Sequence, residues 1–319
     1  MTDLDVVAVG AAALDRQYLV SNLPEPDGGA YADGVEDTFG GVAANVATGC
    51  AQLGRDAGIL TRLGRDDVAD RVLADLDDGP LDTARVRRKP GTSTHCIVLR
   101  DGDGKRSIVT AGDSVKRLRL DEDDVSYLAA ADVVFVTAYA PDPVHQTLLS
   151  CARGERPAGA PADGSFPPVV FDLSGPPAEL DGRGARPGTV DDWLDAAALV
   201  VVGDVAAAGH FGCTGRDAAA LLAERGADRV ASTAGDDGAT LVDGDGLVDV
   251  PAFDVDAVDE TGAGDAYAAG LIHAWLLGDR TATEAGRVAA AAAACNCTEA
   301  GARGGQPTAD ELESFLAVR

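Results

Sequence analysis

The sequence is poor in lysine and in aromatic residues, and it carries far more negative than positive charge. Only three of the 319 residues are lysines, and Phe, Trp and Tyr together make up 4%. Asp and Glu number 53 against 26 Lys and Arg, so the formal net charge is −27. Such a surface repels a nucleic-acid backbone and an anionic lipid surface, so we expect neither nucleic acid nor a membrane as a partner.

The shortage of lysine within this acidic excess is typical of a halophilic protein, and we interpret it as adaptation to high salt. At 1 M ionic strength the Debye length is about 3 Å, which would screen the self-repulsion of the acidic surface. An ordinary acidic protein is the alternative. Because net charge governs solubility rather than fold, the composition says little about chemistry.

Several signals of other protein classes are missing. No apolar run reaches the roughly 18 residues of a membrane-spanning helix, and the acidic start MTDLD lacks the basic region of a signal peptide. The six cysteines include no C-x-x-C pair and no zinc-type spacing, which predicts free thiols in a reducing cytoplasm. Neither GxxxxGK(S/T) nor a helix-opening GxGxxG is present, so we exclude a P-loop and expect no dinucleotide site.

Short β-branched runs alternate with helical stretches along most of the chain. The expected strands are 6–9, 58–61, 133–136, 169–172, 199–202 and 229–233. The expected helices are 43–53, 66–76, 142–152, 214–225, 263–277, 281–297 and 308–317. Nearly continuous apolar strands joined by helices predict a mostly parallel sheet that is covered on both faces.

Two regions break this rhythm, residues 16–38 and 92–110. In the second, the alternating run 94–99 is followed by Asp101-Gly102-Asp103-Gly104 and a returning run 106–109, which predicts a β-hairpin. Strands inserted into an α/β order usually lie off the main sheet. We therefore expect these two regions to form a lid.

The stretch 258–270, VDETGAGDAYAAG, combines glycines and a carboxylate directly before an apolar helix. Gly262, Ala263 and Gly264 would form the first turn of that helix, where free N–H groups and the positive dipole end bind anions. Asp265 lies at the same place and could accept a hydroxyl proton beside a bound phosphate. The alternative is a glycine-rich turn in which the Asp merely caps the helix.

Three motifs together resemble the PfkB carbohydrate-kinase family. Residues 259–265 (DETGAGD) are similar to the family's C-terminal motif D-T-x-G-A-G-D. The N-terminal motif is matched by GGVAANVA (40–47), LG (53–54) and LGRD (63–66), and TAGDDG (233–238) resembles the nucleotide segment T-x-G-x-x-G. Asp15 matches an early substrate-binding aspartate. The motifs occur in family order over essentially the whole chain.

The resemblance implies a ribokinase-like three-layer α/β/α core with a mostly parallel sheet and a small β-strand lid. It implies one kinase domain over residues 1–319, with lid segments at about 16–38 and 92–110. The implied reaction is transfer of the γ-phosphoryl group of ATP to a hydroxyl of a small sugar or sugar acid. Mg²⁺ would accompany ATP, a monovalent cation such as K⁺ could bind nearby, and paired lids would give a homodimer.

The same resemblance assigns roles to individual residues. Asp265 would be the catalytic base. The N–H groups that steady the transferring phosphoryl would be those of Gly262, Ala263 and Gly264. Substrate hydroxyls would be held by Asp15, Gly40, Gly41 and Asn45. The nucleotide would lie along Thr233, Gly235, Gly238 and Asn296, the last lining the adenine pocket, while the alanines at 289–294 are interpreted as core.

The chain also departs from the family pattern. Glu260 places an extra negative charge near the phosphates. The Asn-x-x-Glu segment tied to Mg²⁺ should follow the strand at 199–202, but the chain has Gly203-Asp204-Val205-Ala206 there. We expect Asp204 to serve as a partial replacement at the metal. Ala13 stands where ribokinases carry an extra substrate-binding Asn, which argues against a strict ribokinase.

Two other functions stay open from the sequence. The same scaffold would be a nucleoside kinase if the lid pocket stacks a base. A catalytically weakened relative that binds sugar or nucleotide as a sensor is the third reading, favoured by the absent Asn-x-x-Glu and opposed by the intact GAGD. Ligand-dependent consumption of ATP would separate an enzyme from a sensor.

Overall fold

The computed structural model describes residues 4–102, 105–155, 157–163, 165–244 and 246–319. Its main sheet has nine strands in the order β13-β12-β11-β10-β9-β8-β1-β4-β5. Their bounds are β1 Leu4–Val9, β4 Ala57–Leu63, β5 Asp82–Arg88, β8 Ala131–Thr137, β9 Val169–Leu173, β10 Leu199–Gly203, β11 Arg229–Thr233, β12 Ala239–Asp243 and β13 Gly246–Val250. All neighbours pair in parallel except β11–β12 and β12–β13, which are antiparallel.

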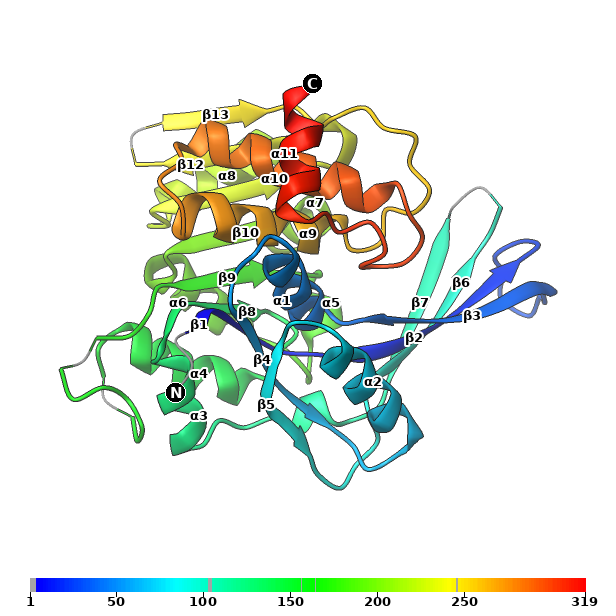
Figure 1. Ribbon diagram of the computed structural model, residues 1–319, viewed down its shortest axis with the longest axis horizontal. Helices are drawn as coiled ribbons and strands as arrows, with labels where there is room; N and C mark the ends of the chain where they lie inside the picture. The colour runs from blue at the N-terminus through cyan, green and yellow to red at the C-terminus, as the bar shows by residue number, and fades with distance from the viewer. Residues whose placement is uncertain (1–3, 103–104, 156, 164, 245) are drawn as a thin grey trace.

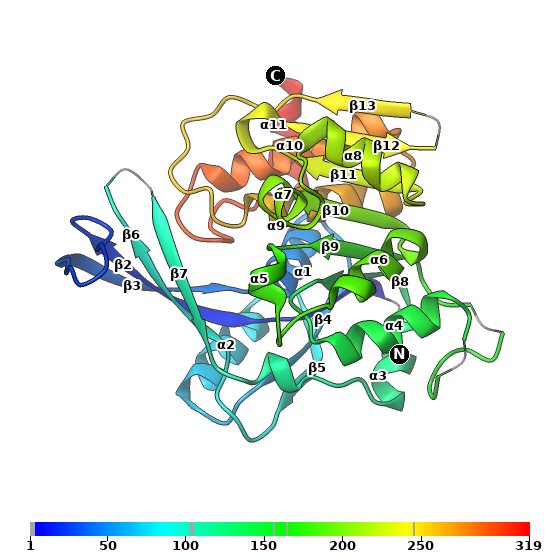
Figure 2. The ribbon, with the colours of Figure 1, turned by 180° about the vertical axis from the view of Figure 1, so that it is seen from behind.

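Alternation along β1, an interior strand, places apolar side chains on both faces of the sheet. In β1, Val6 and Ala8 join one buried core, whereas Val7 and Val9 join the other. Figures 1 and 2 show the two layers of helices that cover these cores. A strand that is buried on both faces has a continuous apolar sequence, as residues 6–9 of β1 do. The predicted mostly parallel sheet with helices on both sides is confirmed.

The two helical layers come from different parts of the chain. One layer contains α1 Val42–Gln52, α2 Asp67–Asp78, α9 Ala263–Leu271, α10 Ala282–Cys297 and α11 Ala309–Ala317. The other contains α3 Glu122–Leu128, α4 Asp142–Ala152, α5 Pro177–Leu180, α6 Pro187–Ala196, α7 Asp204–Phe211 and α8 Gly215–Glu224. None of the helices in the described part of the chain is long and apolar enough to span a membrane.

A second sheet of four strands projects from the main body on one side (Figure 1). Its order is β3-β2-β6-β7, with bounds β2 Ala13–Val20, β3 Ala32–Gly40, β6 His95–Arg100 and β7 Arg106–Ala111. Two antiparallel hairpins, β2–β3 and β6–β7, are joined by the parallel pair β2–β6. The turn expected at 101–104 includes residues 103 and 104, which lie outside the described residues.

Three strands, the four helices α3, α5, α6 and α7, and one helix boundary differ from the sequence-based expectation. The alternation 239–250 forms the antiparallel hairpin β12–β13 at one edge, and β5 extends the other edge, although neither was expected. The helix expected over 263–277 is α9 only to Leu271, after which Ile272–Leu276 form a π-helical turn. The edge strands β5 and β13 carry few buried residues, so their apolar signal is weaker than that of interior strands.

Candidate active site

Glycine shapes the loop before α9 and fixes where that helix begins. Gly262 is its N-cap residue, with φ of 79°, in the left-handed region that favours glycine. A Cβ on Gly262 would lie 2.1 Å from the carbonyl oxygen of Ala302. A Cβ on Gly264 would meet no atom within 4 Å, so this glycine leaves open space at the helix N-terminus. The first turn of α9 thus presents backbone rather than side chains.

Two buried side chains form hydrogen bonds that hold the loop before α9. Asp259 accepts hydrogen bonds from the backbone N–H groups of Thr261 and Gly301, each at 3.0 Å. Burial would raise the pKa of Asp259, but these donors and Arg100 hold that pKa below its usual value. The side-chain amide of Asn296 donates to the Thr261 carbonyl at 2.9 Å. The loop therefore keeps its shape through its own Asp259 carboxylate and through the Asn296 side chain of α10.

Asp265 lies in the first turn of α9 and is bound by a residue from the other end of the chain. The Nδ2 group of Asn45 in α1 donates to its Oδ2 at 2.6 Å. Asp265 is partly accessible to solvent, but its carboxylate is surrounded by protein atoms. Burial raises the pKa of Asp265 to about 7; the bond from Asn45 and the charge of Arg303 oppose this rise, and Asp15 adds to it.

Glycine also allows the approach between β3 and the Asp15 carboxylate of β2. A Cβ on Gly40 would lie 2.2 Å from Oδ2 of Asp15. Gly41, with φ of 95°, turns the chain into α1, and a Cβ there would lie 2.5 Å from the Ala11 carbonyl oxygen. Burial raises the pKa of Asp15. These glycines bring Asp15 and Asn45 to the same region as Asp265.

Two acceptor oxygens near Asp265 have no hydrogen-bond donor. Oδ1 of Asp15 and Oδ1 of Asn45 are buried, and each is without a partner within the described ranges. Buried polar atoms in folded proteins are almost always hydrogen-bonded, so unpartnered ones call for an explanation. Hydroxyl groups of a polyol would supply the donors that these two oxygens lack.

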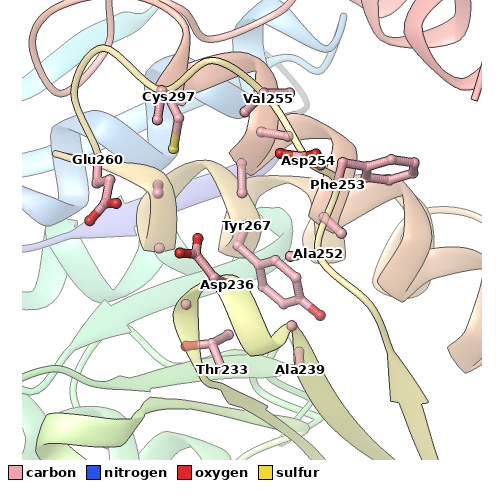
Figure 3. Close-up of a pocket in the computed structure, with 18 of the residues that line it drawn as sticks. Thr233, Asp236, Ala239, Ala252, Phe253, Asp254, Val255, Glu260, Tyr267 and Cys297 are labelled. Carbon is pink, nitrogen blue, oxygen red and sulfur yellow. The ribbon is translucent and has the colours of Figure 1, made fainter.

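A cavity of about 800 Å³ opens beside the N-terminus of α9. Its walls include five residues expected at the phosphoryl and nucleotide sites: Thr233, Gly235, Gly238, Ala263 and Gly264. Figure 3 shows Thr233 at the end of β11, Tyr267 on α9 and Glu260 on the loop before it. The cavity lies where parallel strands end, the usual place for ligands in open α/β sheets.

The structure gives Asn296 and Ala263 contacts that the sequence-based assignment did not expect. Asn296 is fully buried and does not line the cavity; it braces the loop before α9 instead. From the same helix, Ala290, Ala293 and Ala294 line the cavity, while the expected place of the alanine run in the core is borne out by the burial of Ala290 and Ala294. The backbone N–H of Ala263 already donates to the Glu260 carbonyl at 3.2 Å.

Asp204 also lies apart from the cavity. It begins α7, and its Oδ1 accepts a hydrogen bond from the N–H of Gly215 at 2.9 Å. It is not among the lining residues. Across the ranges that the structure describes, no group of three or more His, Cys, Asp or Glu could hold a metal ion. Mg²⁺ bound with a nucleotide often uses only one or two carboxylates, and the cavity offers Asp236 and Glu260.

Two charged residues of this region were missed from the sequence. Asp172 is the penultimate residue of β9 and accepts a hydrogen bond from Ser174; burial and the nearby Asp265 raise its pKa well above the usual value. Arg303 forms an ion pair with Asp75 at 2.9 Å, and its charge lowers the pKa values of Asp15 and Asp265. Asp172 could have been found, because it is the last residue of the strand expected over 169–172; Arg303 lies in a glycine-rich loop without a signal.

Comparisons of the whole sequence with known proteins all give kinases of one family. Residues 3–309 match the profile of pfkB family carbohydrate kinases. The ATP-dependent ribose-1-phosphate kinase of Halopiger xanaduensis is 33% identical over 325 residues, which cover 98% of each chain. Aminoimidazole riboside kinase of Salmonella typhimurium is 28% identical over 302 residues, 87% of each chain.

Solved structures share the fold over almost the full length. The structure of Arabidopsis thaliana ribokinase complexed with ribose and ATP aligns with a TM-score of 0.81 at 23% identity and covers 99% of each chain. That of a putative ribokinase from Agrobacterium tumefaciens aligns at 0.81 with 26% identity, covering 99% of this chain and 98% of the other. These likenesses confirm the predicted ribokinase-like α/β fold.

Proposed function

Because this chain belongs to the pfkB family of carbohydrate kinases, we propose that it transfers the γ-phosphoryl group of ATP to a hydroxyl of ribose or a ribose derivative. Two relatives support this substrate class, since ribose 1-phosphate and aminoimidazole riboside share a ribosyl group. Ribose 1-phosphate is the first candidate, because the kinase named for it is similar over nearly the whole of both chains. A nucleoside is the second, in line with the riboside kinase.

The observation that carries this proposal is the pair of unpartnered oxygens beside Asp265. Oδ1 of Asp15 and Oδ1 of Asn45 are buried acceptors that sugar hydroxyls can satisfy. Asn45 also binds Asp265 directly, so a sugar held by Asn45 would lie next to that carboxylate. Asp265 would take the proton of the acceptor hydroxyl, since a base with a pKa near 7 is suited to neutral pH.

The cavity beside α9 would hold ATP. Its γ-phosphoryl group would lie at the first turn of α9, next to the open space that Gly264 leaves. Mg²⁺ would enter with ATP as part of the substrate, and Asp236 and Glu260 are available as oxygen ligands. A monovalent cation such as K⁺ stays a prediction, and we assign no step to it.

The proposal extends to the domain organisation, the oligomeric state and the cellular location of the protein. The whole chain, residues 1–319, would act as one kinase domain whose four-stranded sheet is the lid. Exposed apolar residues on this lid, Val35, Ile108 and Val109, would pair with a second copy in a homodimer. The six free cysteines support a place in the reducing cytoplasm. Light scattering on the purified protein would detect the dimer, and a monomeric mass would reject it.

The substrate proposal is tested by a panel assay with Mg-ATP in molar KCl. The panel holds ribose 1-phosphate, ribose, inosine, adenosine, hexoses and 2-keto-3-deoxy sugar acids, and mass spectrometry detects phosphorylated products. We expect the highest kcat/KM with a ribosyl compound. A hexose or a sugar acid as the best substrate would reject the ribosyl class, and no product from any compound would reject kinase activity on this panel.

The pH dependence of the reaction should report the state of Asp265. Only the carboxylate can accept a proton, and the pKa of Asp265 is about 7, so kcat/KM should rise with pH and level off above pH 7. Asn45→Ala removes a hydrogen bond that lowers this pKa, so its profile should move to higher pH. A flat profile between pH 5.5 and 8 in the wild type would contradict a base with this pKa.

Salt should stabilise the protein if its acidic surface is adapted to high ionic strength. With a net charge of −27, the acidic side chains repel one another, and salt screens this repulsion. We expect the unfolding temperature to rise by several degrees between 0.1 and 1 M KCl, and more slowly above 1 M, where the Debye length is already about 3 Å. Differential scanning calorimetry measures this shift, and an unfolding temperature independent of KCl would reject the halophilic interpretation.

A further inference from the structure

Two arginines of the β6–β7 hairpin cross from the four-stranded sheet to the loop before α9. Arg100 and Arg106 are paired residues in the hairpin register, so their side chains leave the same face of the sheet. Nη1 of Arg100 lies 3.4 Å from Oδ2 of Asp259, and its Nη2 donates to the Val258 carbonyl. Arg106 donates from Nη1 to Oγ1 of Thr261. The hairpin is thus fastened to the loop that shapes the first turn of α9.

The two arginines differ in whether an acidic residue pairs with their charge. Arg100 is paired with Asp259, a buried carboxylate that is 5% exposed. Arg106 lies against a neutral hydroxyl, and the described residues form no ion pair with it within 4.0 Å. A guanidinium in this position keeps most of its donors available for another acceptor. Arg106 is therefore a cation without a fixed anion.

The cavity next to Arg106 has an excess of negative charge even before a nucleotide binds. Among its described lining residues, Asp236, Asp254 and Glu260 are acidic, and Arg106 is the only Lys or Arg. A nucleoside triphosphate adds further negative charge, which Mg²⁺ neutralises only in part. In phosphoryl transfer most of the protein's contribution is positioning and neutralisation of charge on the equatorial oxygens.

We propose that Arg106 is a catalytic residue of the phosphoryl transfer. When ATP is bound, the Arg106 guanidinium leaves Thr261 and binds the non-bridging oxygens of the γ-phosphoryl group. This inference rests on the proposed kinase function. In the transfer, the acceptor oxygen forms a bond to the γ-phosphorus, the bond to the β–γ bridging oxygen breaks, and ADP leaves. The acceptor proton goes to Asp265, while the guanidinium keeps all its protons. The Arg100–Asp259 pair holds the hairpin in place during this step.

Arginine suits this position better than lysine. Its planar fork can donate two parallel hydrogen bonds to phosphoryl oxygens, whereas an ammonium group acts as a point charge. Arg106→Lys should therefore keep part of the activity, and Arg106→Ala should lose more. Lys105 is the matched control, because it is the neighbouring cation on the same hairpin, is exposed, and does not line the cavity.

The test measures kcat, KM and nucleotide affinity for Arg106→Ala, Arg106→Lys and Lys105→Ala, with the best substrate of the panel. We expect Arg106→Ala to lower kcat by about 10²–10³-fold. Calorimetry should show its affinity for ADP within about threefold of wild type, because ADP lacks the γ-phosphoryl group. Lys105→Ala should resemble wild type. A kcat for Arg106→Ala within threefold of wild type, or an equal loss in Lys105→Ala, overturns the proposal.

A second readout separates this inference from the proposed function. If the wild type phosphorylates nothing in the panel, the kinase proposal fails, and Arg106 is then judged by binding of a non-hydrolysable ATP analogue. Arg106→Ala should bind the analogue at least about tenfold more weakly than wild type, with unchanged affinity for ADP. Equal affinities of the two proteins for the analogue would overturn the role of Arg106 independently of turnover.

Discussion

Replacing Asp265 with asparagine is expected to lower kcat by about 10²–10⁴-fold, the usual contribution of a general base. The side-chain amide has almost the same shape as the carboxylate, and its oxygen can still accept the hydrogen bond from Asn45. It cannot take the proton of the acceptor hydroxyl. Steady-state kinetics with the best panel substrate should therefore show the loss in kcat, with little change in the KM for ATP.

Asp15→Asn is the matched comparison, because it also neutralises a carboxylate of this region. Asp15 has an unpartnered oxygen and is proposed to hold substrate hydroxyls, so this change should raise the KM for the sugar more than it lowers kcat. The two variants would then separate binding from proton transfer. Asp265→Asn with a kcat within tenfold of wild type would show that another group, or water, accepts the proton.

Thermal unfolding shows whether a loss of activity in Asp265→Asn comes from misfolding of the variant. The folded-state pKa of Asp265 is about 7, above the usual 3.8, so ionisation costs folding free energy as pH rises between these values. That cost is fully present above pH 7. The amide avoids it, so at pH 8 the variant should unfold at the same temperature as wild type or higher.

Much of the architecture could be predicted, because central parallel strands leave a strong signal. In a strand such as β1, buried on both faces, residues 6–9 form a continuous apolar run that marks its position with little ambiguity. The edges of the sheet were harder. In β5, Arg85, Arg87 and Arg88 interrupt the apolar pattern, and the β12–β13 hairpin breaks the strand–helix alternation that guided the expectation.

The site was predictable where a motif fixes the backbone and less so where only side-chain direction decides. Gly262 is required by its backbone conformation, which a motif records. Asn296 lies on α10, where a long alanine run gives no apolar stripe that could set the helix phase. Its side chain faces the loop at Thr261, while Ala293 and Cys297 face the cavity. Contacts such as Asn45 with Asp265 join residues 220 positions apart and need the fold.

Gly262→Ala should damage both the stability and the chemistry of the protein. The residue has a φ of 79°, and its new Cβ would lie 2.1 Å from the Ala302 carbonyl oxygen, so the loop 300–304 must move. Strain of this kind costs about 1–3 kcal/mol of the free energy of unfolding. The N–H groups of the first turn of α9 would move with it. Loss of one aligned donor lowers kcat by about 10²–10³-fold.

Gly264→Ala is the comparison for Gly262→Ala in the same turn, because it adds a side chain to the cavity without straining the backbone. A Cβ at position 264 meets nothing within 4 Å and needs no unusual φ, so the unfolding temperature should stay at the wild-type value. Gly264 lines the cavity, and there the added methyl group would compete with the phosphates of ATP, so KM for ATP should rise. If Gly262→Ala instead has the unfolding temperature and the kcat of the wild type, the loop does not hold the phosphoryl group. If Gly264→Ala binds ATP normally, the phosphates lie elsewhere in the cavity.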